Sequence, residues 1–498
     1  MNQLTEAIIM QRLNRNNHPA ERYPEKVLQF GEGNFLRAFA DWQIDQMNRK
    51  ADFNGGVVIV QPLANGMAEQ LNEQDGLYTV YLEGIQNGQA LQEHQVMECV
   101  TRGIDPYARY EVYEELAYQP ELRFIVSNTT EAGIAFQPED RLEDRPQRSY
   151  PGKLTALLYR RYLHFGGDRS KGFIIIPCEL IDRNGEVLKD IVLQYSKLWG
   201  LESEFVSWLE EANTFCCSLV DRIVPGYPKQ RMPHITAELG YEDSFVVVGE
   251  PFHLWVIEGP AWIAQEFPAE AAGLQVKVVE DMAPYRTRKV RILNGAHTAL
   301  TPVAYLYGLE TVGQAVEDEL VGSFVRELID EEIIPTLDLP AEELTAFAAA
   351  VLERFRNPYV EHYVMSIALN SISKFKTRDL PTLTAFVEEQ GRLPERLTFS
   401  LAALIAFYRG EREGEPIQLA DNSAVLDYFR QIWSQYQDTA EDMKQLVSSV
   451  FGQTSFWGMN LNEIPGLTEQ TSRYLYQIRT EGIRQALREL MTHGTLAV

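Results

Sequence analysis

Short apolar runs alternate with amphipathic segments over the first part of the chain, between residues 26 and 284. The clearest runs cover residues 27–30, 57–60, 124–127, 173–177 and 245–248. Runs of this length, separated by helix-length segments, are typical of strands in a largely parallel sheet that helices cover on both faces. The pattern therefore predicts an α/β domain of the nucleotide-binding type over residues 1–285.

After residue 284 the strand signal fades and apolar residues recur at helical spacing instead. Four segments show this spacing most clearly, at residues 341–356, 397–407, 424–436 and 468–491. Apolar positions three and four residues apart indicate helices that bury one face. We therefore expect a second, mainly α-helical domain over residues 286–498, and a length of 498 residues suits two or three domains.

The charge balance and the cysteines narrow the possible partners. The chain has 45 Lys plus Arg against 71 Asp plus Glu, a formal net charge of −26. Such a surface repels nucleic acid. The four cysteines form no CxxC pair and no run approaches the roughly 18 apolar residues of a membrane span. We expect a cytoplasmic protein with no membrane or nucleic-acid partner, and the sequence leaves self-association open.

Two glycines follow the first predicted strand directly. Phe30 is followed by Gly31-Glu-Gly-Asn-Phe35, which places Gly31 and Gly33 at a strand-to-helix turn. Glycines there allow a tight turn and let backbone N–H groups approach a pyrophosphate at the helix N-terminus. We therefore expect residues 30–35, namely Phe30, Gly31, Gly33, Asn34 and Phe35, to contact a dinucleotide, although two glycines after a strand also occur in ordinary turns.

The loop departs from the usual dinucleotide fingerprint in two places. Leu36 stands at the third glycine position, and Gln61 follows the second predicted strand where an acidic residue is expected. Gln61 is still a candidate cofactor contact at that strand end. Its lack of charge leaves the choice between NAD and NADP open.

A polar set of residues lies in the segment between Pro284 and Pro302, which reads as one helix of about four turns. At roughly 100° per residue, Lys289, Asn294 and His297 stand at about 0°, 140° and 80°, so one broad face presents all three. Alcohol oxidation needs a base for the hydroxyl proton and donors that hold the developing alkoxide. Lysine, asparagine and histidine can supply these functions.

Nearby cations bear on whether Lys289 can act as a base. Arg286, Arg288 and Arg291 crowd it with like charge, which lowers the pKa of a lysine from its reference value of about 10.4. The alternative is purely structural. Lys289 would then belong to a solvated basic stripe, Asn294 would cap or kink the helix, and His297 would be a satisfied core histidine.

Several ordered motifs decide between these readings, because together they resemble one family. The segment Lys-Val-Arg-Ile-Leu-Asn-Gly-Ala-His-Thr at 289–298 resembles the signature of the polyol-specific long-chain dehydrogenases, the mannitol dehydrogenase family. Further matching motifs lie at residues 31–37, 127–133, 150–155, 220–225 and 250–258, so that the resemblance spans nearly the whole chain.

The resemblance implies a Rossmann-like NAD-binding domain, a helical C-terminal domain and a mechanism that uses no metal. Carried over by position, Lys289 is the general base, Asn294 stabilises the alkoxide and His297 orients the substrate oxygen. The motif at 127–133 adds Ser127 and Thr129 to the expected cofactor contacts. The chain also lacks the His, Cys and Asp spacing of a zinc site, which speaks against a zinc alcohol dehydrogenase. It has neither a GxSxG elbow nor a P-loop, which speaks against hydrolase and phosphotransferase activities.

One departure from the family pattern bears on the substrate. Where polyol members usually read Cys-Asp-Asn, this chain reads Cys-Glu-Leu-Ile at 178–181, so that Leu180 replaces a presumed oxyanion donor. That version resembles the members that interconvert D-tagaturonate and D-altronate with NADH. Such a hexuronate or aldonate carries a carboxylate, and the expected substrate contacts are Arg286 beside the base and Lys374 in the basic run at 374–378.

Three alternatives remain open at this point. The chain could reduce fructuronate to mannonate, or it could oxidise a neutral polyol such as mannitol. It could also be a dinucleotide-binding protein that has kept the fold and lost catalysis.

Overall fold

The computed structural model describes residues 10–130, 132–435 and 439–493. The chain divides into two compact units, which we describe one at a time. Unit 1 comprises Met1–Gln86 and Ala90–Met282, and unit 2 comprises Asn87–Gln89 and Ala283–Val498. The sequence-based division after residue 285 falls inside helix α10 (Ala283–Arg288), with which unit 2 resumes.

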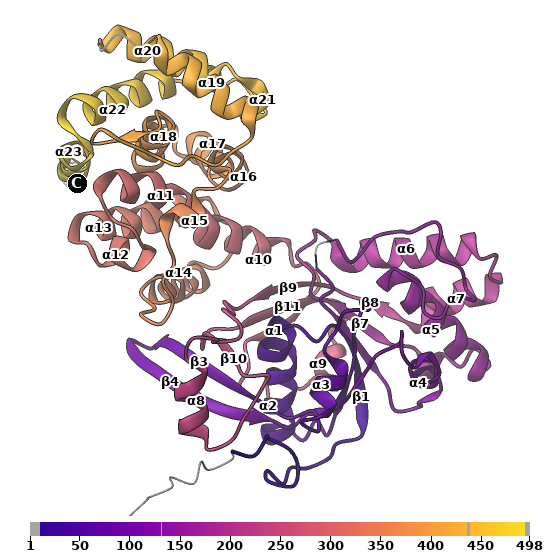
Figure 1. Ribbon diagram of the computed structural model, residues 1–498. Helices are drawn as coiled ribbons and strands as arrows, with labels where there is room; N and C mark the ends of the chain where they lie inside the picture. Colours follow the sequence, from indigo (N-terminus) through magenta and orange to yellow (C-terminus); the bar gives the residue numbers. More distant parts are fainter. Residues whose placement is uncertain (1–9, 131, 436–438, 494–498) are drawn as a thin grey trace, which may run out of the picture. The chain divides into compact units, whose positions relative to one another are not determined.

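Unit 1 is built around a six-stranded sheet in which every neighbouring pair is parallel (Figure 1). Its strand order is β5 (Val100–Ile104), β2 (Gly56–Val60), β1 (Glu25–Phe30), β6 (Phe124–Ser127), β7 (Ile174–Pro177) and β8 (Thr214–Phe215). The order reverses between β1 and β6, and ligands of open α/β sheets bind at such a switch point, outside the carboxyl ends of the strands.

The strands are buried on both faces because their side chains alternate between two apolar cores. In β1, Val27 points into one core while Leu28 and Phe30 point into the other, and β2 repeats the pattern. The first core contains the helical run α1 (Asn34–Leu36), η1 (Arg37–Asp41) and α2 (Trp42–Lys50). The second contains α4 (Tyr110–Glu114), α5 (Tyr150–His164), α6 (Asn184–Leu198) and α7 (Ser203–Ala212). The doubly covered sheet predicted from the sequence is therefore confirmed.

Two smaller sheets complete unit 1. One has the order β10 (Val247–Gly249), β3 (Tyr78–Gln86) and β4 (Gln89–Met97), and the other has β12 (Val276–Val279), β11 (Leu254–Glu258) and β9 (Cys217–Asp221). The apolar run at 245–248 thus contributes to β10 in a separate sheet, and its assignment to the main sheet was wrong. Apolar periodicity identifies a buried strand but does not identify its partner.

Unit 2 is helical, as predicted. Its larger helices are α11 (Ala296–Tyr307), α13 (Glu319–Glu327), α14 (Ala341–Phe355), α16 (Ser371–Arg378), α17 (Leu380–Gln390), α18 (Glu395–Phe407), α19 (Ser423–Ser434), α20 (Ala440–Phe451), α22 (Leu467–Glu481) and α23 (Ile483–His493). Helix α18 is its centre, because residues 396–407 are all buried and the helix packs against α11 and α22. Ser400 ties it to α11 by donating to the carbonyl oxygen of Ala299 at 2.7 Å.

Two helices differ from the sequence prediction. The segment at 468–491 is not one helix, because Gly482 has a φ of 85° and separates α22 from α23. The helix expected to end at Pro302 continues to Tyr307. An internal proline costs a helix about 3 kcal/mol, and the fully buried stretch of α11 around it outweighs that cost. Residue 436, where another predicted helix ends, lies outside the described residues.

No helix within the described ranges is both long and apolar enough to span a bilayer.

Candidate active site

In unit 1 the turn after β1 is tight and has open space at its second glycine. Gly31 adopts a φ of 121° and donates its N–H to the carbonyl oxygen of Val60 at 3.0 Å. A Cβ at Gly31 would lie 2.9 Å from the backbone oxygen of Asn128, whereas one at Gly33 would meet no atom within 4 Å. Gly31 therefore makes the turn, and Gly33 leaves open space at the start of α1, where backbone N–H groups can bind a phosphate.

Arg37 holds this loop from inside. Its buried guanidinium donates through Nε to the carbonyl oxygen of Glu32 at 3.0 Å and through Nη2 to Oδ1 of Asn34 at 2.7 Å. These bonds fix the carbonyl of one loop residue and the side chain of another. Arg37 belonged to a family-like motif in the sequence, but its role as the support of the loop is visible only in the structure.

The side chains of the two aromatic residues predicted as cofactor contacts pack against other aromatic rings of the protein. Phe30 is fully buried and packs against Tyr150 with a ring-centroid distance of 4.8 Å. Phe35 stacks on Phe39 at 4.9 Å. Any contact of Phe30 with a cofactor therefore uses its backbone.

The side chain of Gln61 forms hydrogen bonds with the loop that follows it. Its Nε2 donates to the carbonyl oxygen of Leu63 at 3.0 Å and its Oε1 accepts from the N–H of Ala68 at 3.2 Å. Both ends of the buried amide are thus engaged. The side chain fixes the path of the loop at 62–68, and the loop, rather than the amide, presents a surface at the end of β2.

Glu179 joins the ends of two neighbouring strands. Its Oε1 accepts from the backbone N–H and the hydroxyl of Thr129, and its Oε2 accepts from the hydroxyl of Ser127, each at 3.0 Å. Burial raises the pKa of Glu179, against the lowering effect of these donors. The hydroxyls of Ser127 and Thr129, both predicted as cofactor contacts, thus bind this carboxylate. The sequence analysis missed Glu179, although its place two residues after β7, near the carboxyl end of a parallel strand, was a usable signal.

A cavity of about 320 Å³ opens at this edge of unit 1. It is lined by Leu63 from the loop after β2, by Thr129 after β6 and by Ser149 and Tyr150 at the start of α5. Leu63 has 64% of its surface exposed. A cavity with an apolar wall and a few hydroxyl groups, beyond the carboxyl ends of β2 and β6, suits one end of a dinucleotide.

In unit 2 the predicted catalytic helix has an unexpected geometry. Helix α10 leads into a π-helix, η4 (Lys289–Gly295), before α11 begins. The angles of 0°, 140° and 80° assumed an α-helix throughout and are therefore wrong over this segment. A Cβ at Gly295 would lie 2.9 Å from Oδ1 of Asp379, so glycine lets the wider turn pack against the residue that precedes α17. π-helical turns are rare and frequently lie at functional sites.

His297 is buried and has an unused polar atom. Its ring stacks on Phe355 at a centroid distance of 4.1 Å and meets His362 edge-on at 4.9 Å. Its Nε2 has no hydrogen-bond partner among the described residues. Burial lowers the pKa of His297 well below its usual value, and the nearby charges of Arg378 and Lys374 add to the effect. A neutral imidazole with a free, buried nitrogen is a good candidate for binding a substrate oxygen, since such atoms are rarely left unpaired.

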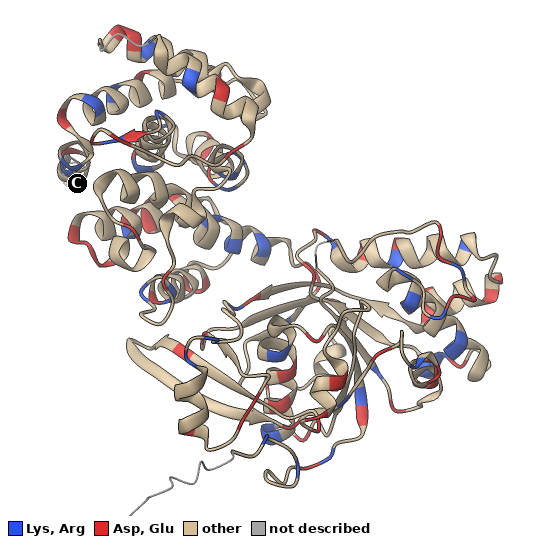
Figure 2. Ribbon diagram, viewed as in Figure 1, with Lys and Arg blue, Asp and Glu red and all other residues tan. Residues whose placement is uncertain are grey.

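The other predicted residues of unit 2 lie around this helix. Lys289 and Asn294 are half-buried in η4. Asn294 and Arg286 line one open cavity of about 420 Å³, which Lys289 does not line. Lys374 donates through Nζ to the carbonyl oxygen of Ile367 at 2.6 Å, and burial followed by the charge of Arg378 lowers its pKa. Figure 2 shows the basic residues along α10 and η4.

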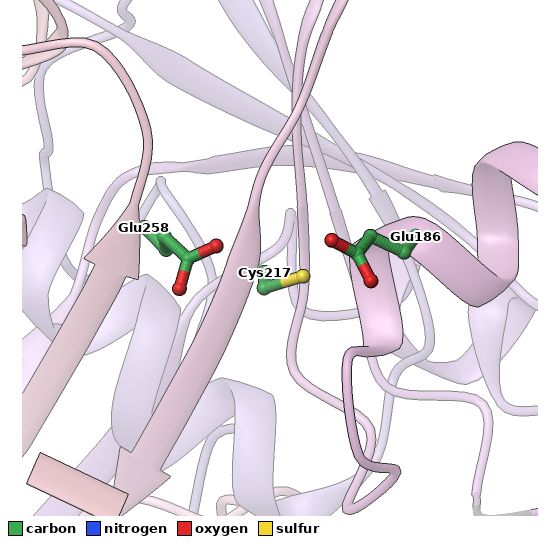
Figure 3. Close-up of side chains that lie close together, drawn as sticks. All are labelled: Glu186, Cys217 and Glu258. Carbon is green, nitrogen blue, oxygen red and sulfur yellow. The ribbon is translucent and has the colours of Figure 1, made fainter. Parts of the chain in front are cut away.

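One cluster in unit 1 has the donor types of a metal site. Glu186, Cys217 and Glu258 place a carboxylate oxygen or a sulfur within 4.8 Å of one another (Figure 3). Arg183, however, donates to Glu258 at 2.6 Å and 2.8 Å and to Glu186 at 2.5 Å. Because the guanidinium of Arg183 already donates hydrogen bonds to both carboxylates, the cluster is explained as an ion-pair network.

Comparisons with known proteins agree on one family. The description "Mannitol dehydrogenase Rossmann domain" matches residues 25–270, and "Mannitol dehydrogenase C-terminal domain" matches residues 281–479. Among curated proteins, the chain is 56% identical to an altronate oxidoreductase of Bacillus subtilis (strain 168) over 486 residues, covering 97% of this chain and 99% of that protein. It is 49% identical to an altronate oxidoreductase of Escherichia coli O1:K1 / APEC over 482 residues, covering 97% and 100%.

Two solved structures share the fold. One is Pseudomonas fluorescens mannitol 2-dehydrogenase in a ternary complex with NAD and D-mannitol, with a TM-score of 0.65 and 22% identity over 97% of this chain and 100% of that one. The other is a D-sorbitol dehydrogenase in substrate-free form, with a TM-score of 0.77 and 24% identity over 94% and 96%. At these identities the likeness concerns the fold.

Proposed function

The chain belongs to the mannitol dehydrogenase family, and on that premise we propose that it is an NAD-dependent oxidoreductase that interconverts D-tagaturonate and D-altronate. The observation that carries the proposal is the full-length identity of 56% and 49% to two altronate oxidoreductases. The segment at 178–181 supports the same substrate through its resemblance to the members that interconvert D-tagaturonate and D-altronate, and Leu180 in it lies with 64% of its surface exposed. We further propose that the protein acts in the cytoplasm, which its four free, buried cysteines support.

The residues of unit 1 fit the cofactor. Gly31 makes the turn, Gly33 leaves space at the start of α1, and Arg37 fixes the loop between them. We propose that these residues and Thr129 hold NAD, with Ser127 and Glu179 fixing Thr129 in place. When bound, NAD supplies the carbon that accepts or donates the hydride.

Residues of unit 2 would handle the proton and the oxygen. In altronate oxidation, Lys289 takes the hydroxyl proton, the amide of Asn294 donates a hydrogen bond to the developing alkoxide, and His297 binds the same oxygen through Nε2. The lowered pKa of His297 keeps its ring neutral, so it orients the oxygen without competing for the proton. In the reverse direction Lys289 returns the proton.

The substrate assay measures NADH oxidation by the purified protein with D-tagaturonate, D-fructuronate and D-fructose in parallel. We expect a clear preference for D-tagaturonate. Preference for D-fructuronate or D-fructose would retain the dehydrogenase chemistry and refute the substrate. Tight NADH binding without turnover of any of them would support the catalytically silent alternative. Repeating the assay with NADPH decides the cofactor, and comparable efficiencies with both would show that the uncharged end of β2 tolerates a 2′-phosphate.

The role of Lys289 is tested by Lys289→Ala. We expect kcat to fall by roughly 10²- to 10⁴-fold, the usual contribution of a general acid or base, with NADH affinity within about threefold. Lys444→Ala is the matched control. It removes an exposed lysine of α20 that pairs with Glu469 of α22 and lines neither cavity. A Lys289→Ala enzyme with most of its activity would remove Lys289 from the mechanism.

A further inference from the structure

The open cavity of about 420 Å³ in unit 2 brings together arginines from two separate segments. Arg286 and Arg291 come from α10 and η4, and Arg378 comes from the end of α16. Asn294 and Thr377 add polar groups to the same wall. Three guanidiniums around one cavity make a locally positive site in a chain whose formal net charge is −26.

Two of these guanidiniums have donors to spare. Arg291 donates through Nη1 to the hydroxyl of Thr382 at 2.9 Å, and Arg378 donates through Nη1 to the hydroxyl of Thr298 at 3.2 Å. Each bond uses one of five N–H donors and goes to a neutral partner, which positions the group without cancelling its charge. Both side chains are half-buried, and burial lowers the pKa of each. They are therefore held in place and partly desolvated, unlike arginines on a solvated face.

The acid that interacts with both Arg378 and Arg291 is Asp379, which is buried. Its Oδ2 has no hydrogen-bond partner among the described residues. Burial raises the pKa of Asp379 well above its usual value, against the pull of the two arginines. Even a fully ionised Asp379 offsets only one of the two charges of Arg378 and Arg291, so this pair keeps a net positive charge beside the cavity.

We propose that this cavity binds the carboxylate of the sugar acid, with Arg378 and Arg291 as its main partners and Arg286 contributing further positive charge. The inference rests on the proposed function, because only a substrate with a carboxylate needs such a site. A guanidinium matches a carboxylate with two parallel N–H donors. The site also lies next to the chemistry, since Asn294 lines the same cavity and the charge of Arg378 reaches His297. In a 2-ketohexuronate three carbons separate the ketone from the carboxylate. Residues of one helical segment can therefore contact both groups of the same molecule.

The decisive comparison uses two substrates that differ only in the carboxylate, D-tagaturonate and D-tagatose. The variants are Arg378→Gln and Arg291→Gln, with Arg378→Lys as the variant that conserves charge. The matched control is Lys376→Gln, which removes a cation from the same helix α16 but from outside the cavity, where Lys376 lies near Gly458. A thermal melt of each variant verifies that it is folded. Steady-state kcat/KM is measured for each substrate, and KM for NADH is measured alongside.

We expect each Gln variant to lower kcat/KM for D-tagaturonate by about 10- to 150-fold, the value of one hydrogen bond to a charged group. Arg378→Lys should recover part of the loss, Lys376→Gln should cause none, and D-tagatose turnover should change by less than about threefold. If wild-type turnover of D-tagatose is too slow to measure, calorimetric binding of D-altronate and of its neutral alditol to the NADH-loaded enzyme, which cannot oxidise them, gives the same comparison.

Equal losses for the charged and the neutral ligand would overturn the proposal, because the arginines would then act on structure alone. A rise in KM for NADH with unchanged KM for D-tagaturonate would overturn it too, by assigning the cavity to a cofactor phosphate. The failure of the proposed function looks different, since the wild-type enzyme itself would then not prefer D-tagaturonate.

Discussion

Replacing each of the two glycines of the turn after β1 by alanine should affect stability and cofactor binding differently. At Gly31 the φ of 121° lies in a region that is essentially restricted to glycine, and the new Cβ would meet a backbone oxygen at 2.9 Å. At Gly33 the φ is −66° and no atom lies within 4 Å of the new Cβ. Gly31→Ala therefore strains the folded chain, and Gly33→Ala only fills space that the cofactor needs.

The strain at Gly31 is worth about 1–3 kcal/mol for the backbone conformation, before any cost of the close contact with Asn128. For a unit of this size that corresponds to a fall in Tm of roughly 2–10 °C. Gly33→Ala should leave Tm within about 1 °C, because alanine readily adopts its backbone angles. Both variants should bind NADH at least tenfold more weakly, the first through a displaced loop and the second through a methyl group in the phosphate site.

Differential scanning fluorimetry without cofactor gives the stability, and a fluorescence titration with NADH gives the affinity. Gly88→Ala is a useful control for the conformational effect, since its φ is 74° but no atom lies within 4 Å of its Cβ. The reasoning would be refuted by equal destabilisation at Gly31 and Gly33. Unchanged NADH affinity in Gly33→Ala would show that the cofactor does not use the open space at the start of α1.

Two further predictions concern buried groups of unit 1. Burial, with the charge of Arg222, lowers the pKa of His253 from 6.5 to about 3, so between these values the unfolded chain binds a proton that the folded one does not. The free energy of unfolding therefore falls as the pH drops below 6.5, by about 2 kcal/mol at pH 5. Urea titrations at pH 7 and pH 5 should show that loss in the wild type but not in His253→Gln. Glu179→Leu leaves the donors of Ser127 and Thr129 unpaired, which should cost roughly 2–4 kcal/mol and weaken NADH binding about tenfold. Glu179→Gln keeps an acceptor and should retain most of the stability and most of the NADH affinity. Equal effects of the Leu and Gln variants would show that Glu179 does not act as the acceptor for Ser127 and Thr129.

The main sheet could be predicted from the sequence because its strands are buried on both faces. Continuous apolar runs such as that of β2 have few other interpretations when helix-length segments separate them. The same reasoning could not place the strand β10, because its partner β3 lies more than 160 residues away and pairing depends on the whole fold. The glycine turn was recognisable since Gly31 and Gly33 directly follow a strand, but only the structure shows that they do different things.

The candidate site was harder to predict than the main sheet, because its geometry depends on contacts between residues that are far apart in the sequence. Glu179 is fixed by residues some 50 positions away, so no local pattern reveals that it organises the strand ends. The arginine cavity combines two basic runs that looked independent in the sequence, and each run also contains a cation that does not line the cavity. Arg378 lines the cavity and Lys376 does not, because the two differ by about 200° around α16.

The π-helix accounts for what the periodicity got wrong at the catalytic segment. With 100° per residue, Asn294 and His297 stand about 140° and 80° from Lys289. In a π-turn the hydrogen bond spans five residues instead of four, so Asn294 takes the place relative to Lys289 that a residue at i+4 has in an α-helix, about 40° away. One extra residue absorbed in the turn likewise moves His297 to the equivalent of i+7, about 20° away. A uniform α-helix would spread the three groups over a broad face, whereas the wider turn of η4 is expected to bring them closer together around the helix axis. We therefore expect the extra residue that breaks the sequence pattern to favour convergence of the three groups on a single substrate oxygen.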